Sequence, residues 1–347
     1  MTKSVKVGNI YIGGGAPISI QSMTNTDTAD FESTVAQIKS LQSVGCDIVR
    51  MTVNTDEAAR RVKDIVDRVD IPLVADIHFD YKLAVKSMEN GIDKIRFNPG
   101  NIGDDDKVKV IADCAKAHGV PIRIGVNGGS IEEEFLSQYG RGSKALVESA
   151  LKHVRLLEKV GFYDTVISVK SSSTKTTVDA YRMLSNEVDY PLHVGVTEAG
   201  LDDEGIYKSV AGIGSLLLDG IGDTIRVSLT GAPEKEVEVA RKLLRAVGVD
   251  KNYVEVVSCP TCGRCSLDLE GIVKEVKVRT KEVKKPLKIA IMGCVVNGIG
   301  EAGDCDFGIA GGRDKSVLFE KGQVIHTIDN CDIVGELIRL VERYTNG

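Results

Sequence analysis

The segment FESTVAQIKSLQSVGCDIVRMTV, residues 31–53, contains the unit that decides the fold of most of the chain. Apolar side chains recur at spacings of three and four in its first part, which predicts an amphipathic helix, and Gly45 is a typical helix stop. The β-branched residues 47–53 then predict a buried strand. Buried strands that alternate with helices are typical of proteins with a parallel sheet.

The same alternation continues to about residue 250. Eight stretches predict strands: PISIQSM from Pro17, DIVRMTV from Asp47, PLVADI from Pro72, KIRFNP from Lys94, PIRIGVN from Pro121, TVISVK from Thr165, PLHVGVT from Pro191 and TIRVSL from Thr224. Eight strand-helix units favour a TIM (β/α)8 barrel. The alternative, a doubly wound sheet, usually has fewer units and needs a point at which the strand order reverses.

The pattern changes after Val247. The remaining residues predict strands at 253–257, 288–293 and 307–311, helices at 269–280 and 332–344, and a hairpin around 318–328. We therefore expect an α/β protein with two domains: a substrate-binding TIM barrel over residues 1–250 and a small α/β domain with the cysteine-rich turn over residues 251–347.

Composition excludes two broad classes of function. The chain has 44 Lys and Arg against 50 Asp and Glu, a net charge of −6, which argues against a general nucleic-acid surface. No uncharged apolar run approaches the length of a membrane span, and the opening MTKSVKVGNI lacks the apolar core of a secretion signal. We expect a cytoplasmic protein whose eight cysteines are metal ligands, redox groups or small core residues.

Five cations are expected at the carboxyl ends of five different predicted strands, where a barrel carries its active site. They are Arg50, Arg96, Arg123, Lys170 and Arg226. Each one alone could pair with a neighbouring acid, but the obvious strand-end acids, Asp76 and Glu198, are too few for five buried cations. Because arginine forks match phosphate oxygens, this imbalance predicts a small ligand with two phosphates or an equivalent anion.

Polar side chains surround these cations at even offsets, which return a strand side chain to the same face. They are His78, Asn98, Asn127 and Ser228. The glycine-rich turns at residues 98–103 and 127–130 add backbone N–H groups that are compatible with an anion, although such turns are more often only turns.

The cysteines of the second domain indicate a metal. Cys259, Cys262 and Cys265 follow the spacing C-x2-C-x2-C, and Cys294 and Cys305 come later. Five thiols could build a closed structural zinc site. The spacing also resembles part of a bacterial ferredoxin motif, so an iron-sulfur cluster is the other interpretation. The remaining cysteines, Cys46, Cys114 and Cys331, are interpreted as small apolar residues.

Seven motifs in order along nearly the whole chain resemble one known family. They are VGCDIVRMTV, ADIHFDY, IRFNPGNIG, IRIGVNGGS, GVTEAG, SCPTCGR and GCVVNGIGEAG. The family is that of the bacterial 4-hydroxy-3-methylbut-2-enyl diphosphate synthases of non-mevalonate isoprenoid biosynthesis. The resemblance implies a TIM barrel with a [4Fe-4S] domain that reductively opens 2-C-methyl-D-erythritol 2,4-cyclodiphosphate, with electrons from reduced flavodoxin or ferredoxin.

The resemblance also implies roles for individual residues. The cluster ligands are Cys259, Cys262, Cys294 and Glu301, which makes Cys265 a bystander. The five barrel cations clamp the diphosphate, and Glu198 contacts the substrate hydroxyls and helps to deliver a proton. The supporting pocket residues are Asp76, His78 and Asn127, and Asn297 contacts the substrate from the cluster domain. The strand offsets given above add Asn98 and Ser228 to the substrate-binding set.

Chain geometry predicts a homodimer. The last barrel helix ends near Val247 and runs from the mouth towards the opposite end, so the cluster domain begins far from the mouth of its own barrel. A head-to-tail dimer, in which each cluster domain closes the barrel of the partner subunit, solves this problem symmetrically.

Two other functions stay open on the residues alone. SMTNTDT, residues 22–28, resembles a loop of the dihydropteroate synthases, so the chain could be a pterin-type transferase whose cysteines hold structural zinc. A binding or regulatory iron-sulfur protein with a decayed barrel is the third possibility.

Overall fold

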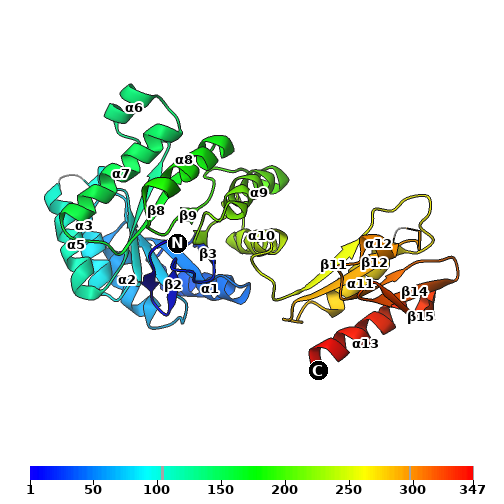
Figure 1. The fold of residues 1–347 in the computed structure, drawn as a ribbon. Coiled ribbons are helices and arrows are strands. Elements are labelled where there is room, and N and C mark those ends of the chain that lie inside the picture. Colours follow the sequence, from blue (N-terminus) through cyan, green and yellow to red (C-terminus); the bar gives the residue numbers. More distant parts are fainter. Residues whose placement is uncertain (103–104, 297, 347) are drawn as a thin grey trace. The chain divides into compact units, whose positions relative to one another are not determined.

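The computed structural model describes residues 1–102, 105–296 and 298–346. The chain divides into two compact units, Met1–Val249 and a second unit that begins at Asp250. The predicted fold class, a TIM barrel followed by a small α/β domain, is confirmed (Figure 1). In the described part of the chain, no helix combines the length and apolar character needed to cross a membrane.

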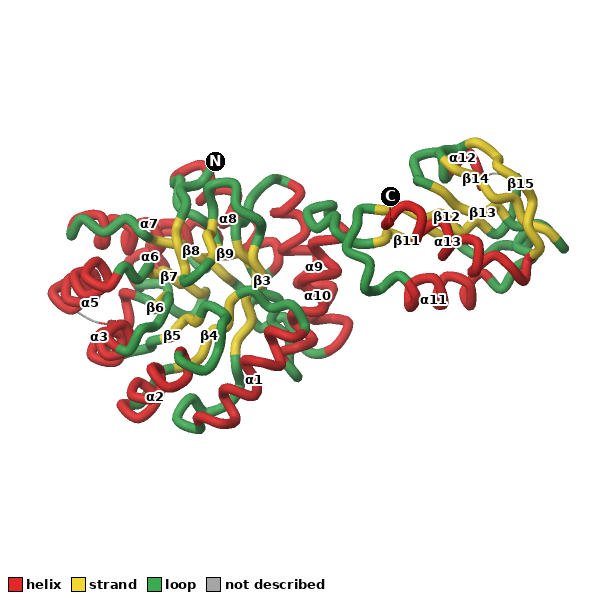
Figure 2. Tube along the Cα trace, turned by 90° about the horizontal axis from the view of Figure 1, so that it is seen from below, coloured by secondary structure: helices red, strands yellow, loops and turns green. Residues whose placement is uncertain are grey.

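The first unit is an eight-stranded parallel barrel. Its strands are β3 (Ser19–Met23), β4 (Ile48–Thr52), β5 (Leu73–Asp76), β6 (Lys94–Phe97), β7 (Ile122–Asn127), β8 (Thr165–Lys170), β9 (His193–Val194) and β10 (Thr224–Ile225). The hydrogen-bonded order runs β8-β7-β6-β5-β4-β3-β10-β9, and a parallel bridge between Ile167 and Leu192 joins its two ends. Figure 2 shows the strands in yellow inside a layer of helices in red.

The helices of the barrel alternate with the strands, as the repeating pattern predicted. They are α1 (Phe31–Ser43), α2 (Asp56–Val66), α3 (Tyr81–Glu89), α5 (Asp105–His118), α7 (Ser143–Lys159), α8 (Thr174–Glu187), α9 (Asp202–Leu218) and α10 (Pro233–Ala246). Two short helices, α4 (Pro99–Ile102) and α6 (Glu133–Tyr139), were not predicted. Several starts are capped by side chains: the hydroxyl oxygen of Thr55 accepts from the Ala58 N–H, and that of Ser173 from the Thr176 N–H.

A short N-terminal hairpin, β1 (Val5–Val7) with β2 (Ile10–Ile12), was also missed from the sequence. Its buried side chains form a separate apolar cluster with residues at the starts of the barrel strands. The cluster contains Val5, Val7, Ile12, Ile48, Val74 and Val166. The hairpin therefore packs on the end of the barrel that is opposite the carboxyl ends of the strands.

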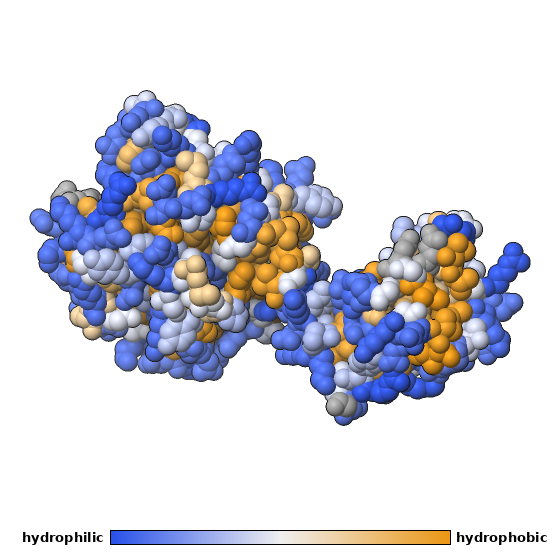
Figure 3. All heavy atoms as spheres, in the orientation of Figure 1, coloured by the Kyte–Doolittle hydropathy of each residue, from blue (hydrophilic) through white to orange (hydrophobic). Residues whose placement is uncertain are grey.

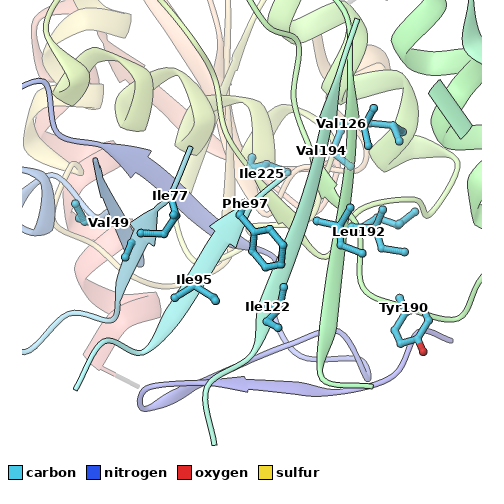
Figure 4. Close-up of a cluster of buried hydrophobic side chains, with 14 of the residues drawn as sticks. Val49, Ile77, Ile95, Phe97, Ile122, Val126, Tyr190, Leu192, Val194 and Ile225 are labelled. Atoms are coloured by element: carbon cyan, nitrogen blue, oxygen red, sulfur yellow. The ribbon is translucent and has the colours of Figure 1, made fainter. Parts of the chain in front are cut away.

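The main core lies between the barrel and its helices. Figure 4 shows part of it, with Val49, Ile95, Phe97, Val194 and Ile225 among the labelled side chains. Since successive strand residues point to opposite faces, the alternate residues of these strands point into the barrel. A TIM barrel usually fills this interior with branched apolar side chains, whereas this one places cations there, among them Arg96, Arg123 and Lys170.

The second unit is a five-stranded sheet with helices. Its strands, in sheet order, are β11 (Val254–Ser258), β12 (Leu287–Met292), β13 (Phe307–Ala310), β14 (Lys315–Glu320) and β15 (Gln323–Asp329). The first three are parallel and the last two form an antiparallel hairpin. The helices are α11 (Leu269–Arg279), α12 (Gly298–Glu301), the 3-10 turn η1 (Asn330–Asp332) and α13 (Ile333–Asn346).

This unit has two small cores, one on each face of its sheet. Helices α11 and α13 pack together, and the larger core lies beneath them, with Ile289, Phe307 and Leu337 fully buried. The smaller core includes Met292, Cys305 and Phe319. In Figure 3, hydrophobic side chains gather in the region of β14 and β15; Val324 and Ile325 of β15 are exposed.

Candidate active site

One carboxylate holds two of the predicted cations inside the barrel. Asp76, the last residue of β5, lies 2.9 Å from Nη1 of Arg96 and 3.5 Å from Nε of Arg50. Burial alone would raise the pKa of Asp76, but the two guanidinium groups outweigh this effect and lower it to about 2. Burial and the neighbouring arginines also lower the pKa of Arg50, to about 10.

A helix supplies the second interior acid. Glu236, in the first turn of α10, lies 3.3 Å from both Nε and Nη2 of Arg226. Its carboxylate also accepts hydrogen bonds from the Ser22 hydroxyl and the Leu229 backbone N–H, both at 3.0 Å. β10 is shorter than the predicted strand and ends at Ile225. Glu236 was missed from the sequence, although it lies on the same helical face as Ala240, where an apolar residue is usual.

Arg123 and Lys170 have no carboxylate partner among the ion pairs of the described residues. Arg123 is 1% exposed and Lys170 is 7% exposed. Burial, and then the other cations of the barrel, lower the pKa of both side chains well below their usual values. One detail of the prediction is wrong: Arg123 is the second residue of β7, so it lies near the start of the strand and not at its carboxyl end.

Two glycines make room for this cluster. A Cβ atom at Gly125 would lie 2.6 Å from Nε of Arg96, and one at Gly195 would lie 2.7 Å from Nζ of Lys170. These distances are shorter than real Cβ contacts, so both cations lie directly against bare backbone. Gly125 lies two residues from both Arg123 and Asn127, and this even spacing is a sequence signal that could have identified it.

A methyl group at Gly125 should therefore destabilise the barrel. Arg96 cannot simply turn aside, because it is held by Asp76 at 2.9 Å and by the Gly125 carbonyl at 3.3 Å. We expect Gly125→Ala to lower the free energy of unfolding by about 1–3 kcal/mol through overpacking, measured by urea denaturation. The matched control is Gly129→Ala, where a Cβ would meet no atom within 4 Å. Equal stability of the two variants would contradict this account.

The predicted polar neighbours lie in different environments. Asn98 is 3% exposed, whereas His78, Asn127 and Ser228 are half-buried at strand ends. Glu198 is exposed and has a φ of 52°, a backbone strain that sets it apart from ordinary loop residues. A cavity of about 450 Å³ brings Glu198 and Asn127 together, with Gly129, Arg141, Ser171 and Thr197 also in its lining.

The charge count of the interior favours an anionic ligand. In the described part of the chain, Asp76 and Glu236 are the buried acids that form ion pairs with the predicted cations, and Glu198, expected as a strand-end acid, is exposed. Two carboxylates cannot balance five cations in a region that is largely closed to water. A small ligand with two phosphates supplies the missing negative charge and suits the arginine forks.

Some of the cysteines of the second unit lie around the carboxyl ends of β11 and β12. These strands are parallel neighbours, with Ser258 opposite Ile291, so Cys259 and Cys294 follow adjacent strand ends. The Gly293 N–H donates to the Cys259 sulfur at 3.2 Å, a contact that suits a thiolate ligand. Cys262 is exposed, and hydrogen bonding from Arg264 lowers the pKa of its thiol.

The other three thiols of this unit are those of Cys265, Cys305 and Cys331. A Cβ atom at Gly293 would lie 2.6 Å from the Cys265 sulfur and 3.6 Å from the Cys259 sulfur, so Cys265 is close to Cys259. Cys331 is exposed, so its interpretation as a small buried residue is wrong. The Cys265 thiol donates to the Leu267 carbonyl at 3.4 Å, and Cys305 is buried in the smaller core, where burial raises the pKa of its thiol. Among the described residues, no three His, Cys, Asp or Glu side chains meet as a metal site. Asn297 lies outside the described residues, and so does the side chain of Glu301.

These features define a class of protein: a barrel enzyme for a small polyanion, joined to an α/β domain that presents cysteines. The profile of the GcpE TIM-barrel domain matches residues 2–241, and that of the GcpE protein C-terminal domain matches residues 255–343. The chain belongs to the GcpE family.

Relatives with printed names cover almost the whole chain. The 4-hydroxy-3-methylbut-2-en-1-yl diphosphate synthase (flavodoxin) of Caldanaerobacter subterraneus subsp. tengcongensis is 56% identical over 99% of this chain and 97% of its own. The enzyme of the same name from Clostridium perfringens is 55% identical over 98% of each chain.

Two solved structures match about 71% of the chain. The dihydropteroate synthase of Yersinia pestis has a TM-score of 0.51 and 12% identity, over 71% of this chain and 99% of its own. The type I 3-dehydroquinate dehydratase of Clostridium difficile has the same TM-score and coverage at 17% identity. At such low identities these matches show the barrel fold and do not favour the pterin-type transferase.

Proposed function

We propose that this chain is an iron-sulfur oxidoreductase that converts 2-C-methyl-D-erythritol 2,4-cyclodiphosphate to (E)-4-hydroxy-3-methylbut-2-enyl diphosphate. The names of the relatives support this reaction and flavodoxin as the electron donor, with ferredoxin as a second possible donor. The observation that carries the proposal is the excess of buried cations over the two interior acids, because a cyclic diphosphate supplies the missing negative charge.

The barrel residues bind and orient the substrate. The clamp on the two phosphates consists of Arg50, Arg96, Arg123, Lys170 and Arg226. Asp76 and Glu236 position three of these arginines through the ion pairs described above. Asn98, Asn127, His78 and Ser228 provide further polar contacts at the strand ends. Glu198 lines the same cavity as Asn127. It contacts the substrate hydroxyls and helps to deliver a proton to the substrate.

The residues of the second unit fit a [4Fe-4S] cluster. Cys259, Cys262 and Cys294 would hold it together with Glu301, and Asn297 would contact the substrate. The Gly293 N–H on the Cys259 sulfur and the adjacent strand ends support this set. When bound, such a cluster supplies single electrons and an iron that acts as a Lewis acid. A carboxylate ligand suits a position that a substrate oxygen must reach, because it holds iron less firmly than thiolate.

The proposed reaction changes the negative charge that the site must hold. Two electrons and one proton enter, the C–O bond to one phosphate breaks, and the C3 oxygen leaves as water. The diphosphate stays on the product, which carries one more negative charge than the substrate. The clamp therefore holds more negative charge after the reaction than before it. The free thiols that the cluster needs suit the reducing cytoplasm, which is the compartment we propose.

We also propose a head-to-tail homodimer. Helix α10 follows the mouth end of β10 and runs back along the barrel, and β11 begins after the short link 247–253.

Mixing Glu301→Ala chains with Glu198→Gln chains should restore activity that neither variant has alone, because each mixed dimer has one intact site. Light scattering should give twice the chain mass; an active monomer would contradict the dimer.

The function is tested on protein prepared without oxygen. We expect about four iron and four sulfide per chain, and turnover of the cyclodiphosphate when reduced flavodoxin is added. Bound zinc without sulfide would contradict the proposed iron-sulfur cluster. It would favour the pterin-type transferase with a structural zinc site. An intact cluster without turnover would leave a binding or regulatory iron-sulfur protein.

A further inference from the structure

Lys94 is a buried cation for which the reaction, as described so far, has no role. It is the first residue of β6 and points into the barrel, on the same strand face as Arg96 and Asn98. Its side chain is fully buried, and Nζ has no hydrogen-bond partner in the described part of the chain. A buried amine without a partner is costly, so its retention inside a barrel calls for an explanation.

The groups that act on Lys94 come from several elements, and nearly all of them are cationic. Arg123 of β7 and Arg50 of β4 repel its charge, and His193 of β9 also interacts with it. Asp93 is the one acid among these groups. Its carboxylate is already engaged by the Leu73 backbone N–H at 2.8 Å.

His193 and Gln21 continue this layer of polar groups. His193 is fully buried, and both of its ring nitrogens lack a partner among the described residues. The side-chain amide of Gln21 is also buried and unpartnered there. Lys94 therefore faces a polar interior that contains no free carboxylate in the described structure.

The surroundings of Lys94 disfavour its protonated form while the barrel is empty. Burial first, and then Arg123 and Arg50, lower the pKa of Lys94 well below its usual value. Burial and the same cations lower the pKa of His193. A polyanion among these cations reverses the effect, since each negative charge stabilises a protonated amine nearby.

We propose that Lys94 takes up a proton when the cyclic diphosphate binds and releases it when the product leaves. This inference rests on the proposed function. The nitrogen lone pair accepts a proton from solvent, an N–H bond forms, and no electron is transferred. Lys94 is a positioning residue: its charge acts together with those of Arg123 and Arg50 during turnover, and contact with the substrate is not required.

The test is calorimetric titration of the complete, cluster-loaded protein with the cyclodiphosphate, without reductant. Two buffers of different ionisation enthalpy give the number of protons taken up. Each phosphorus of this ligand carries one strongly acidic oxygen, so any proton taken up near neutral pH belongs to the protein. We expect Lys94→Met to bind the ligand and to take up about one proton fewer than the unchanged protein.

Matched variants distinguish Lys94 from its neighbours. Lys170 also takes up a proton if it is neutral when the barrel is empty, but it remains in Lys94→Met and does not alter the difference. His193→Gln should retain the uptake that Lys94→Met loses. Equal uptake in Lys94→Met and the unchanged protein, or loss in His193→Gln instead, would overturn the proposal.

A second measurement needs no variant. Because ligand binding raises the pKa of Lys94, affinity should be highest at low pH and should fall as the pH rises through the ligand-bound value. A flat dependence of affinity on pH would overturn the proposal, and a flatter one in Lys94→Met would support it. Absence of any binding would overturn the proposed function as well, and binding without proton uptake would overturn only the inference about Lys94.

Discussion

Replacing Lys170 by Met should weaken substrate binding by more than an order of magnitude without weakening the fold. Lys170 is the last residue of β8, its Nζ lies against the backbone of Gly195, and it is 7% exposed. Loss of one buried charge partner typically weakens binding by about 2–5 kcal/mol, so the dissociation constant of the cyclodiphosphate should rise by roughly 30- to 5000-fold. Calorimetric titration measures the change.

The same substitution should leave the free energy of unfolding unchanged or raise it. Without a ligand, Lys170 is surrounded by cations, and no carboxylate of the described residues pairs with it, so Met removes repulsion at similar volume. The control is Lys175→Met on α8, whose side chain is 86% exposed and pairs with Asp179. An affinity of Lys170→Met within a few-fold of the control would exclude Lys170 from the clamp.

The second large effect concerns the thiols. We expect Cys294→Ala to lose the cluster iron and all detectable turnover, because a proposed ligand at the end of β12 is removed. Cys265→Ala is the matched control: the thiol of Cys265 donates to the Leu267 carbonyl, so iron and turnover should be retained. Iron analysis and the visible absorption of the cluster report the outcome. If Cys265→Ala also loses iron, Cys265 is a ligand and the proposed set is wrong.

Most of the fold could be predicted because its signals are local. The strand of residues 47–53 and the helix before it are visible in the periodicity of their side chains. The same order of helix and strand recurs along the barrel. The hairpin of β1 and β2 could not be predicted in the same way. Each of its strands is three residues long, and they are fixed by contacts with Ile48, Val74 and Val166, which are distant in the sequence.

The candidate site could be predicted as a set of residue types and less well as an arrangement. Alternation along β6 identifies Arg96 and Asn98 as neighbours on one face. Alternation does not indicate how far a side chain lies from the mouth of the barrel. That distance depends on how the strands are staggered around the barrel. For this reason Arg123 was expected too close to the mouth. Glu236 was missed because it comes from a helix, and pairing between a helix and a strand leaves no short-range pattern.

The N-terminal hairpin covers one end of the barrel, so the other end is the mouth. Its valines and isoleucines cover the end opposite the strand carboxyl ends with hydrocarbon, a medium through which ions and water pass poorly. The positive potential of the interior is therefore focused towards the mouth, while the chain as a whole carries a net charge of −6. We therefore expect an anion in solution to be attracted towards the mouth, so the hairpin, at the opposite end of the barrel, helps to set the direction from which substrate enters.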